Sequence, residues 1–174
     1  PRSGEFISLL RANLLRECRI PISPCTHHGP CALPGGLVSH KTGGKTTGKT
    51  KWCHFAFDTE DAPKELHILS AAAHIPKERA VLSFLLAGST SGETLNQKKQ
   101  NLRTEKIRVI SDSFPLKNNA DKDSWGRYGC SEQGLVLVAG SRKALEAAPS
   151  GALEELELMK EKDAKSGAFM VMKK

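Results

Sequence analysis

The sequence predicts an α/β fold in which a helix and short strands are followed by a small β-rich C-terminal unit with helices. Apolar side chains recur at a helical spacing over residues 5–17, and residues 80–87 are apolar on both faces, as a buried strand requires. Two further apolar runs, 106–110 and 135–139, predict strands of the C-terminal unit. We therefore divide the chain into a region 1–88, a polar linker 89–104, and a unit 105–174 that ends in a helical tail.

The first region begins with the amphipathic helix 5–17. Its predicted polar face holds three charged residues, Arg11, Arg16 and Glu17. The short strand 19–23 follows, and Pro21 limits it to an edge or a strand end because proline has no N–H to donate. A long loop, 29–51, separates this strand from a predicted short helix, 66–74.

The second half of the chain alternates apolar runs with polar connections. Residues 89–103 and 118–124 are polar and predict loops. Ser141 is placed to cap a short helix that continues to residue 147. Ser150 is placed to cap a second helix, which we expect to continue to about residue 162.

The chain is basic, because 26 Lys and Arg residues stand against 19 Asp and Glu, giving a net charge of +7. Such an excess suits a polyanionic partner, RNA above all, although a basic protein without such a partner has the same composition. No run of 18 apolar residues occurs, so we expect no membrane-spanning helix. The chain begins with Pro rather than Met, and its three Met residues lie near the other end, so we expect a fragment of a longer protein.

Cysteines carry the clearest chemical signal. Cys25, Cys31, Cys53 and Cys130 each lie among Gly, Pro, His or aromatic residues rather than on a regular apolar face. The Gly-Pro step before Cys31 allows the backbone to fold back, so that its sulfur and that of Cys25 can face one centre. Thiolates are soft ligands that suit zinc or an iron-sulfur cluster, and the alternative is four unrelated thiols. The fifth cysteine, Cys18, lies at the end of the predicted helix and is expected to be structural.

Lysines of the long loop form a predicted basic arm. Its members are Lys41, Lys45, Lys49 and Lys51. Residues 43–50 also match the phosphate-binding pattern G-x-x-x-x-G-K-T, but neither the preceding strand nor the following helix that this pattern needs is present in the sequence. We therefore reject nucleotide binding and expect the arm to contact RNA phosphates or to be a solvated loop.

The cysteine segments resemble one protein family. Cys25-x-His-x-Gly-Pro-Cys-x-Leu after a strand, together with Trp52-Cys53-His54-Phe55, is similar to the methyltransferase-like proteins that assemble the mitochondrial small ribosomal subunit. Members carry a Rossmann-like domain that binds AdoMet, followed by a helix similar to residues 4–17 and a strand that ends in a segment similar to Ser23-Pro24-Cys25. The resemblance covers roughly residues 3–140.

The resemblance implies a 4Fe-4S cluster held by Cys25, Cys31, Cys53 and Cys130. It also implies that helix 5–17 and strands 19–23 and 80–87 are the end of a Rossmann-like methyltransferase sheet, with a cysteine-rich loop, 24–57, inserted between the two strands. The implied partners are small-subunit ribosomal RNA and ribosomal proteins in the mitochondrial matrix, and AdoMet would bind only the intact parent. The competing hypothesis is a zinc-bearing RNA-binding module with no methyltransferase role.

Overall fold

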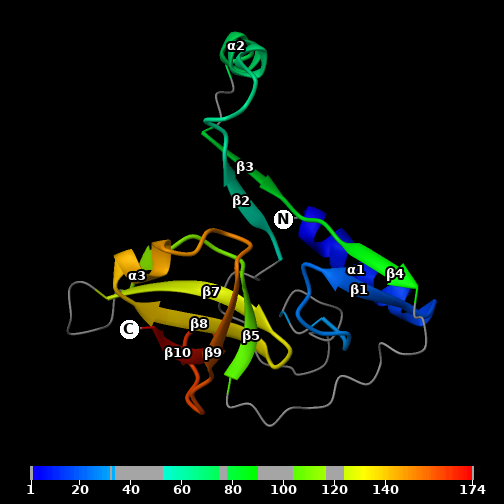
Figure 1. Ribbon diagram of the computed structural model, residues 1–174, viewed down its shortest axis with the longest axis vertical. Helices are drawn as coiled ribbons and strands as arrows, with labels where there is room; N and C mark the ends of the chain where they lie inside the picture. The colour runs from blue at the N-terminus through cyan, green and yellow to red at the C-terminus, as the bar shows by residue number, and fades with distance from the viewer. Residues whose placement is uncertain are drawn as a thin grey trace.

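The computed structural model describes residues 2–31, 33, 53–74, 78–89, 104–116 and 124–173. Within these ranges the chain is a mixed α/β protein that is mostly β, with a curled six-stranded sheet and two two-stranded ribbons (Figure 1). No helix in these ranges is long and apolar enough to cross a membrane. Most of the predicted loops 29–51, 89–103 and 118–124 lies outside the described residues.

The predicted first helix and strand are both present. Helix α1 spans Arg2–Arg16, and strand β1, Arg19–Ser23, follows it directly. Strand β4, Leu86–Ser89, pairs antiparallel with β1 to form the first ribbon. Helix α1 lies alongside this ribbon (Figure 1). Because β4 is the partner of β1 within the described ranges, β1 keeps one open edge, as its proline predicts.

The inward face of α1 differs from the predicted one. Ser8 and Arg11 are buried, whereas the apolar side chains of Phe6 and Leu9 are 63% and 39% exposed. The placement of Arg11 on a solvent face was therefore wrong. Arg11 turns inward because it donates hydrogen bonds to Cys25 and His27, on the segment that follows β1. The spacing of apolar residues along the helix gives no information about such distant partners.

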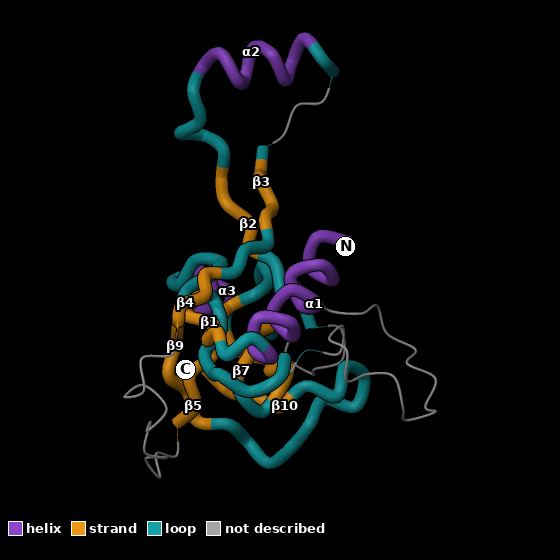
Figure 2. The backbone as a smooth tube through the Cα atoms, turned by 90° about the vertical axis from the view of Figure 1, so that its right-hand side faces the viewer, coloured by secondary structure: helices purple, strands orange, loops and turns teal. Residues whose placement is uncertain are grey.

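The second ribbon is a projecting arm. Strand β2, Phe55–Asp58, pairs antiparallel with β3, Arg79–Leu82, and helix α2, Lys64–Ala72, lies at the far end (Figures 1 and 2). Helix α2 confirms the predicted short helix, and none of its side chains is buried.

The predicted buried strand 80–87 was wrong. The run is divided between β3 and β4, with an irregular segment, 83–85, between them, and all four residues of β3 are exposed. The division follows from two different pairings, since β3 extends the arm and β4 pairs with β1. An apolar run alone does not say which partner each of its halves will find.

The C-terminal unit is the six-stranded sheet, with the path β10-β8-β7-β5-β9 and β6 paired to β7. Its strands are β5 Thr104–Val109, β6 Phe114–Pro115, β7 Trp125–Ser131, β8 Gly134–Gly140, β9 Leu153–Glu157 and β10 Phe169–Lys173. The predicted strands 106–110 and 135–139 correspond to β5 and β8. Neighbours are antiparallel except β8 and β10, which are parallel. Helix α3, Arg142–Glu146, begins after Ser141, whose Oγ accepts from the Ala144 N–H, as predicted.

The second predicted helix of this unit, 150–162, was wrong, and so was the helical tail. Residues Leu153–Glu157 form strand β9, which pairs with β5, and the chain ends in strand β10. Gly151 has a φ of +86°, a conformation that breaks helical continuation just before β9. Pairing with the open edge of β5 therefore overrides the helical propensity of a Leu- and Glu-rich segment.

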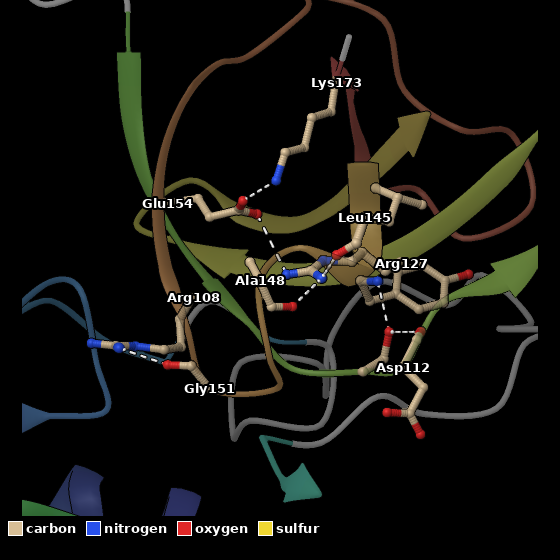
Figure 3. Close-up of polar contacts among 10 residues, drawn as sticks. Arg108, Asp112, Arg127, Leu145, Ala148, Gly151, Glu154 and Lys173 are labelled. Atoms are coloured by element: carbon tan, nitrogen blue, oxygen red, sulfur yellow. Dashed lines mark hydrogen bonds and ion pairs between the residues drawn. The ribbon is translucent and has the colours of Figure 1, made fainter. Parts of the chain in front are cut away.

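A buried guanidinium holds the end of this sheet together. Arg127 of β7, 3% exposed, donates to the carbonyls of Leu145 and Ala148 (Figure 3). Its Nη2 lies 3.5 Å from Glu154 Oε2, and Glu154 also pairs with Lys173. One charge network therefore joins β7, the segment after α3, β9 and β10.

Replacing Arg127 with Met should destabilise the protein by about 3 kcal/mol, because the buried Leu145 carbonyl and the partly buried Ala148 carbonyl lose their donor and Glu154 loses one cation. Urea unfolding followed by circular dichroism measures the change. The matched control is Arg142→Met, which removes an exposed pair with Glu146 and should cost less than about 1 kcal/mol. Equal losses in the two variants would contradict the central role of Arg127.

Candidate metal centre

The structure brings the four predicted cysteines to one place. Cys31, Cys53 and Cys130 pack against the same apolar cluster, and Cys25, Cys31 and Cys53 line one cavity. The charges of the other three thiols contribute to the raised pKa of Cys130, so Cys130 lies in the neighbourhood of these thiols. Cys18, by contrast, is exposed at the end of α1, and none of the five forms a disulfide.

Cys25 is positioned by contacts from helix α1 and from the six-stranded sheet. It directly follows Pro24, which is buried at the end of β1. Arg11 Nε of α1 lies 3.2 Å from Cys25 Sγ. From the C-terminal sheet, Arg108 of β5 donates to the Pro24 carbonyl at 2.9 Å and to the Gly151 carbonyl at 2.8 Å, the latter drawn in Figure 3. Arg108 thus ties the cysteine loop to the six-stranded sheet.

Cys53 lies at the root of the arm, two residues before β2. Its carbonyl accepts a hydrogen bond from Ser83 Oγ at 2.7 Å, which joins it to the segment between β3 and β4. Phe55, 1% exposed, packs against Phe84 with ring centroids 5.4 Å apart and forms part of the apolar wall. Trp52, which precedes Cys53 in the sequence, lies outside the described residues.

Cys130 is delivered by the β7–β8 hairpin, where it is opposite Leu135. Side chains alternate across a strand, so Cys130 and the preceding Gly129 face opposite sides of the sheet. A Cβ on Gly129 would lie 2.3 Å from Ile107 Cγ2, which shows how closely β5 approaches β7 at this point. Glycine therefore permits the strand contact that carries Cys130 towards the other thiols.

Burial favours the protonated form of three of these thiols, those of Cys25, Cys53 and Cys130. It raises the pKa of Cys53 to about 12, and the charges of Cys25 and Cys31 add to the rise. Burial is also the main cause that raises the pKa of Cys130 and of Cys25, although the Arg11 charge and hydrogen bond oppose it at Cys25. A metal that binds here must therefore displace protons from sulfur.

Unpaired polar atoms surround Cys25. Within the described ranges, five buried side-chain nitrogen or oxygen atoms have no hydrogen-bond partner, and four of them lie on α1 or beside Cys25: Ser8 Oγ, Arg11 Nη1, Thr26 Oγ1 and His27 Nδ1. Burial, together with the charges of Arg11 and His28, lowers the pKa of His27 to about 4, so its ring is neutral at pH 7. Buried polar atoms normally find partners, so their concentration beside Cys25 fits a site for a polar or charged group.

Two further points concern the predicted basic arm and the geometry of a metal site. The basic arm lies outside the described residues, which do not include Lys41, Lys45, Lys49 or Lys51. Among the residues that the structure does describe, no three His, Cys, Asp or Glu side chains are arranged as a ready site for a metal ion. The gathered thiols therefore lack the tight spacing of a preformed single-ion site.

Three functional contacts were missed by sequence reasoning, namely those of Arg11, Arg108 and Ser83. The inward position of Arg11 does have a signal in the sequence. Gly4, Ser8 and Arg11 are separated by four and then three residues, so these small or polar residues lie in one row along α1. Arg108 and Ser83 carry no such signal, since their partners are backbone carbonyls of distant segments.

Comparisons with known proteins add no relative. No family model, no curated protein and no solved structure matches this chain.

Replacing Arg108 with Met should loosen the cysteine loop from the six-stranded sheet. Two hydrogen bonds from a charged donor are lost, which should cost about 2 kcal/mol and expose residues 24–31 to limited proteolysis. Lys106→Met is the matched control, because Lys106 is exposed on the same face of β5. If the loop is cleaved no faster in the Arg108 variant than in this control, the hydrogen bonds of Arg108 do not hold the loop in place.

Proposed function

We propose that this chain is part of a methyltransferase-like assembly factor of the mitochondrial small ribosomal subunit, and that it binds a 4Fe-4S cluster and ribosomal RNA. One observation carries the proposal: thiols from three distant segments converge in an apolar setting that is lined with unpaired polar atoms. Cys25, Cys31, Cys53 and Cys130 are the proposed ligands. The family assignment itself rests on the resemblance of the cysteine segments.

Four thiols are a donor set that suits either an iron-sulfur cluster or a zinc ion, and the resemblance of the cysteine segments is what favours the cluster. A tetrahedral zinc site with Zn–S bonds of about 2.3 Å needs sulfurs about 3.8 Å apart. A four-iron cluster is larger, so its ligand sulfurs stand farther apart. The cluster with four thiolates is also an anion, and it would compensate the buried Arg11 cation.

When bound, the cluster would supply four strong bonds between segments that are far apart in the sequence. Cys25 and Cys31 follow β1, Cys53 precedes the arm, and Cys130 belongs to the six-stranded sheet. Bonds that close long loops restrict the unfolded chain most, so occupancy of the site should stabilise the arrangement of all three sheets. We propose a structural role for the cluster on this basis.

We further propose that α1, β1 and β4 are the last elements of a Rossmann-like methyltransferase sheet. A helix followed by an antiparallel strand pair supports this, and so does the exposure of Ile22 and Leu86, which are both 55% exposed on the pair. The pocket for AdoMet would lie upstream, because this chain shows no glycine-rich turn between a strand and a helix of the kind that such a pocket needs. Any methyl transfer would then belong to the intact parent.

Metal analysis of the protein purified without oxygen tests the cluster. We expect a brown protein with about four iron and four sulfide per chain. Changing any one of Cys25, Cys31, Cys53 or Cys130 to Ser should lower iron retention by more than the roughly 10-fold that changes next to metal ligands cost. Cys18→Ser is the matched control and should retain iron like the wild type, because Cys18 is exposed and does not line the cavity.

A colourless protein with one zinc ion per chain would overturn the cluster and favour the zinc-bearing RNA-binding module. Full iron retention after Cys130→Ser would instead leave the cluster in place but remove Cys130 from its ligands. The two results are separate, because the first is read on the wild type and the second on a variant.

The basic arm is tested by changing Lys41, Lys45, Lys49 and Lys51 to Ala together. If they contact RNA phosphates, affinity for single-stranded ribosomal RNA should fall, and the slope of log affinity against log salt should flatten by up to about 3. Filter binding at several salt concentrations measures both. A control that changes four exposed lysines, Lys64, Lys143, Lys160 and Lys165, to Ala removes the same charge elsewhere. An equal change of slope in the two variants would show that the basic arm has no specific role in RNA binding.

A further inference from the structure

Arg11 occupies an unusual place for a helix arginine. It is 3% exposed and projects from α1 into the cavity that Cys25, Cys31 and Cys53 line. Its Nε donates to Cys25 Sγ at 3.2 Å, and its Nη2 donates to the His27 carbonyl at 3.1 Å. The remaining nitrogen, Nη1, is buried and has no partner among the described residues.

The Arg11 charge also lacks a carboxylate partner within the described ranges. The ion pairs found there belong to Arg79, Arg127, Arg142 and Lys173. Burying a guanidinium without an anion costs several kcal/mol, so such a residue is normally paired. The acidic groups that the guanidinium faces are thiols, because Arg11 Nε donates to Cys25 Sγ and Arg11 lines one cavity with Cys25, Cys31 and Cys53.

We infer that Arg11 is the counter-ion and hydrogen-bond donor of the proposed cluster, and that it sets both the retention and the reduction potential of that cluster. The inference rests on the proposed function, because it assumes that the four cysteines hold an iron-sulfur anion. Arg11 is a positioning residue in this account, since it acts through Cys25 and through the charge of the cluster. It also joins α1 to the metal centre.

Two effects of the guanidinium follow from its geometry. Its positive charge and its N–H donated to sulfur stabilise the more negative, reduced form of a cluster, so both raise the potential. The planar guanidinium donates to Cys25 Sγ and to the His27 carbonyl at the same time, and so fixes the backbone around Cys25, the first proposed ligand. A lysine would keep the charge but could not make both hydrogen bonds with the same geometry.

The test compares full-length chains reconstituted without oxygen from ferrous iron and sulfide. The variants are Arg11→Met and Arg11→Lys, and the matched controls are Arg16→Met and Arg16→Lys, because Arg16 is exposed on the same helix. Iron and sulfide per chain, the rate at which a chelator removes iron, and the potential from a redox titration followed by electron paramagnetic resonance are measured.

We expect Arg11→Met to lose iron about 10-fold faster than the wild type and to have a more negative potential. Arg11→Lys should also lose iron faster, with a potential closer to that of the wild type. Both Arg16 variants should match the wild type. A purely structural Arg11 would change the melting temperature and the rate of iron loss but not the potential, so an unchanged potential in both Arg11 variants overturns the inference.

The experiment distinguishes failure of the proposed function from failure of the Arg11 inference. A wild type without iron and sulfide overturns the cluster, and with it the role of Arg11, before any variant is measured. A wild type with the cluster and an Arg11→Met variant that matches it overturns the role of Arg11 alone. If Arg11→Met does not fold, Arg11→Lys against Arg16→Lys decides, since equal retention and equal potential contradict the inference.

Discussion

The meeting of four partly buried thiols is the constraint on which the arrangement of the three sheets depends. Cysteines from the end of β1, the root of the arm and strand β7 lie around one apolar cluster. Bringing segments so distant in sequence together costs loop-closure entropy. Local contacts offset part of that cost: Arg108 holds the Pro24 carbonyl, Ser83 holds the Cys53 carbonyl, and Phe55 packs on Phe84.

The cavity around these thiols also holds a buried positive charge, that of Arg11, for which the described residues supply no carboxylate. Burial raises the pKa of the Cys53 and Cys130 thiols, while the Arg11 guanidinium in the same cavity as Cys53 has one nitrogen without a partner among the described residues. Deprotonated sulfur bound to metal would supply the missing negative charge and would replace weak packing with bonds. Metal binding and folding are coupled wherever ligands come from separate segments, and this site has that character.

Elements with a strong local signal were predictable. Helix α1, strand β1 with its proline, strands β5 and β8, and helix α3 with its Ser141 cap follow from spacing, burial pattern and capping chemistry. Elements decided by pairing were not. The 80–87 run divided between two ribbons, and the Leu- and Glu-rich segment after Gly151 became β9 because β5 offered an open edge and Arg127 and Lys173 offered charges for Glu154.

The sequence by itself determined which side chains are candidate metal ligands, because thiols in glycine- and proline-rich segments can be recognised without coordinates. Only the tertiary structure decided that these thiols meet, that Arg11 turns inward while Phe6 remains exposed, and that Arg108 links the cysteine loop to the six-stranded sheet. The physical reason is that residue type sets what a side chain can bind, whereas its partners come from segments far away in the chain, and local periodicity carries no information about them.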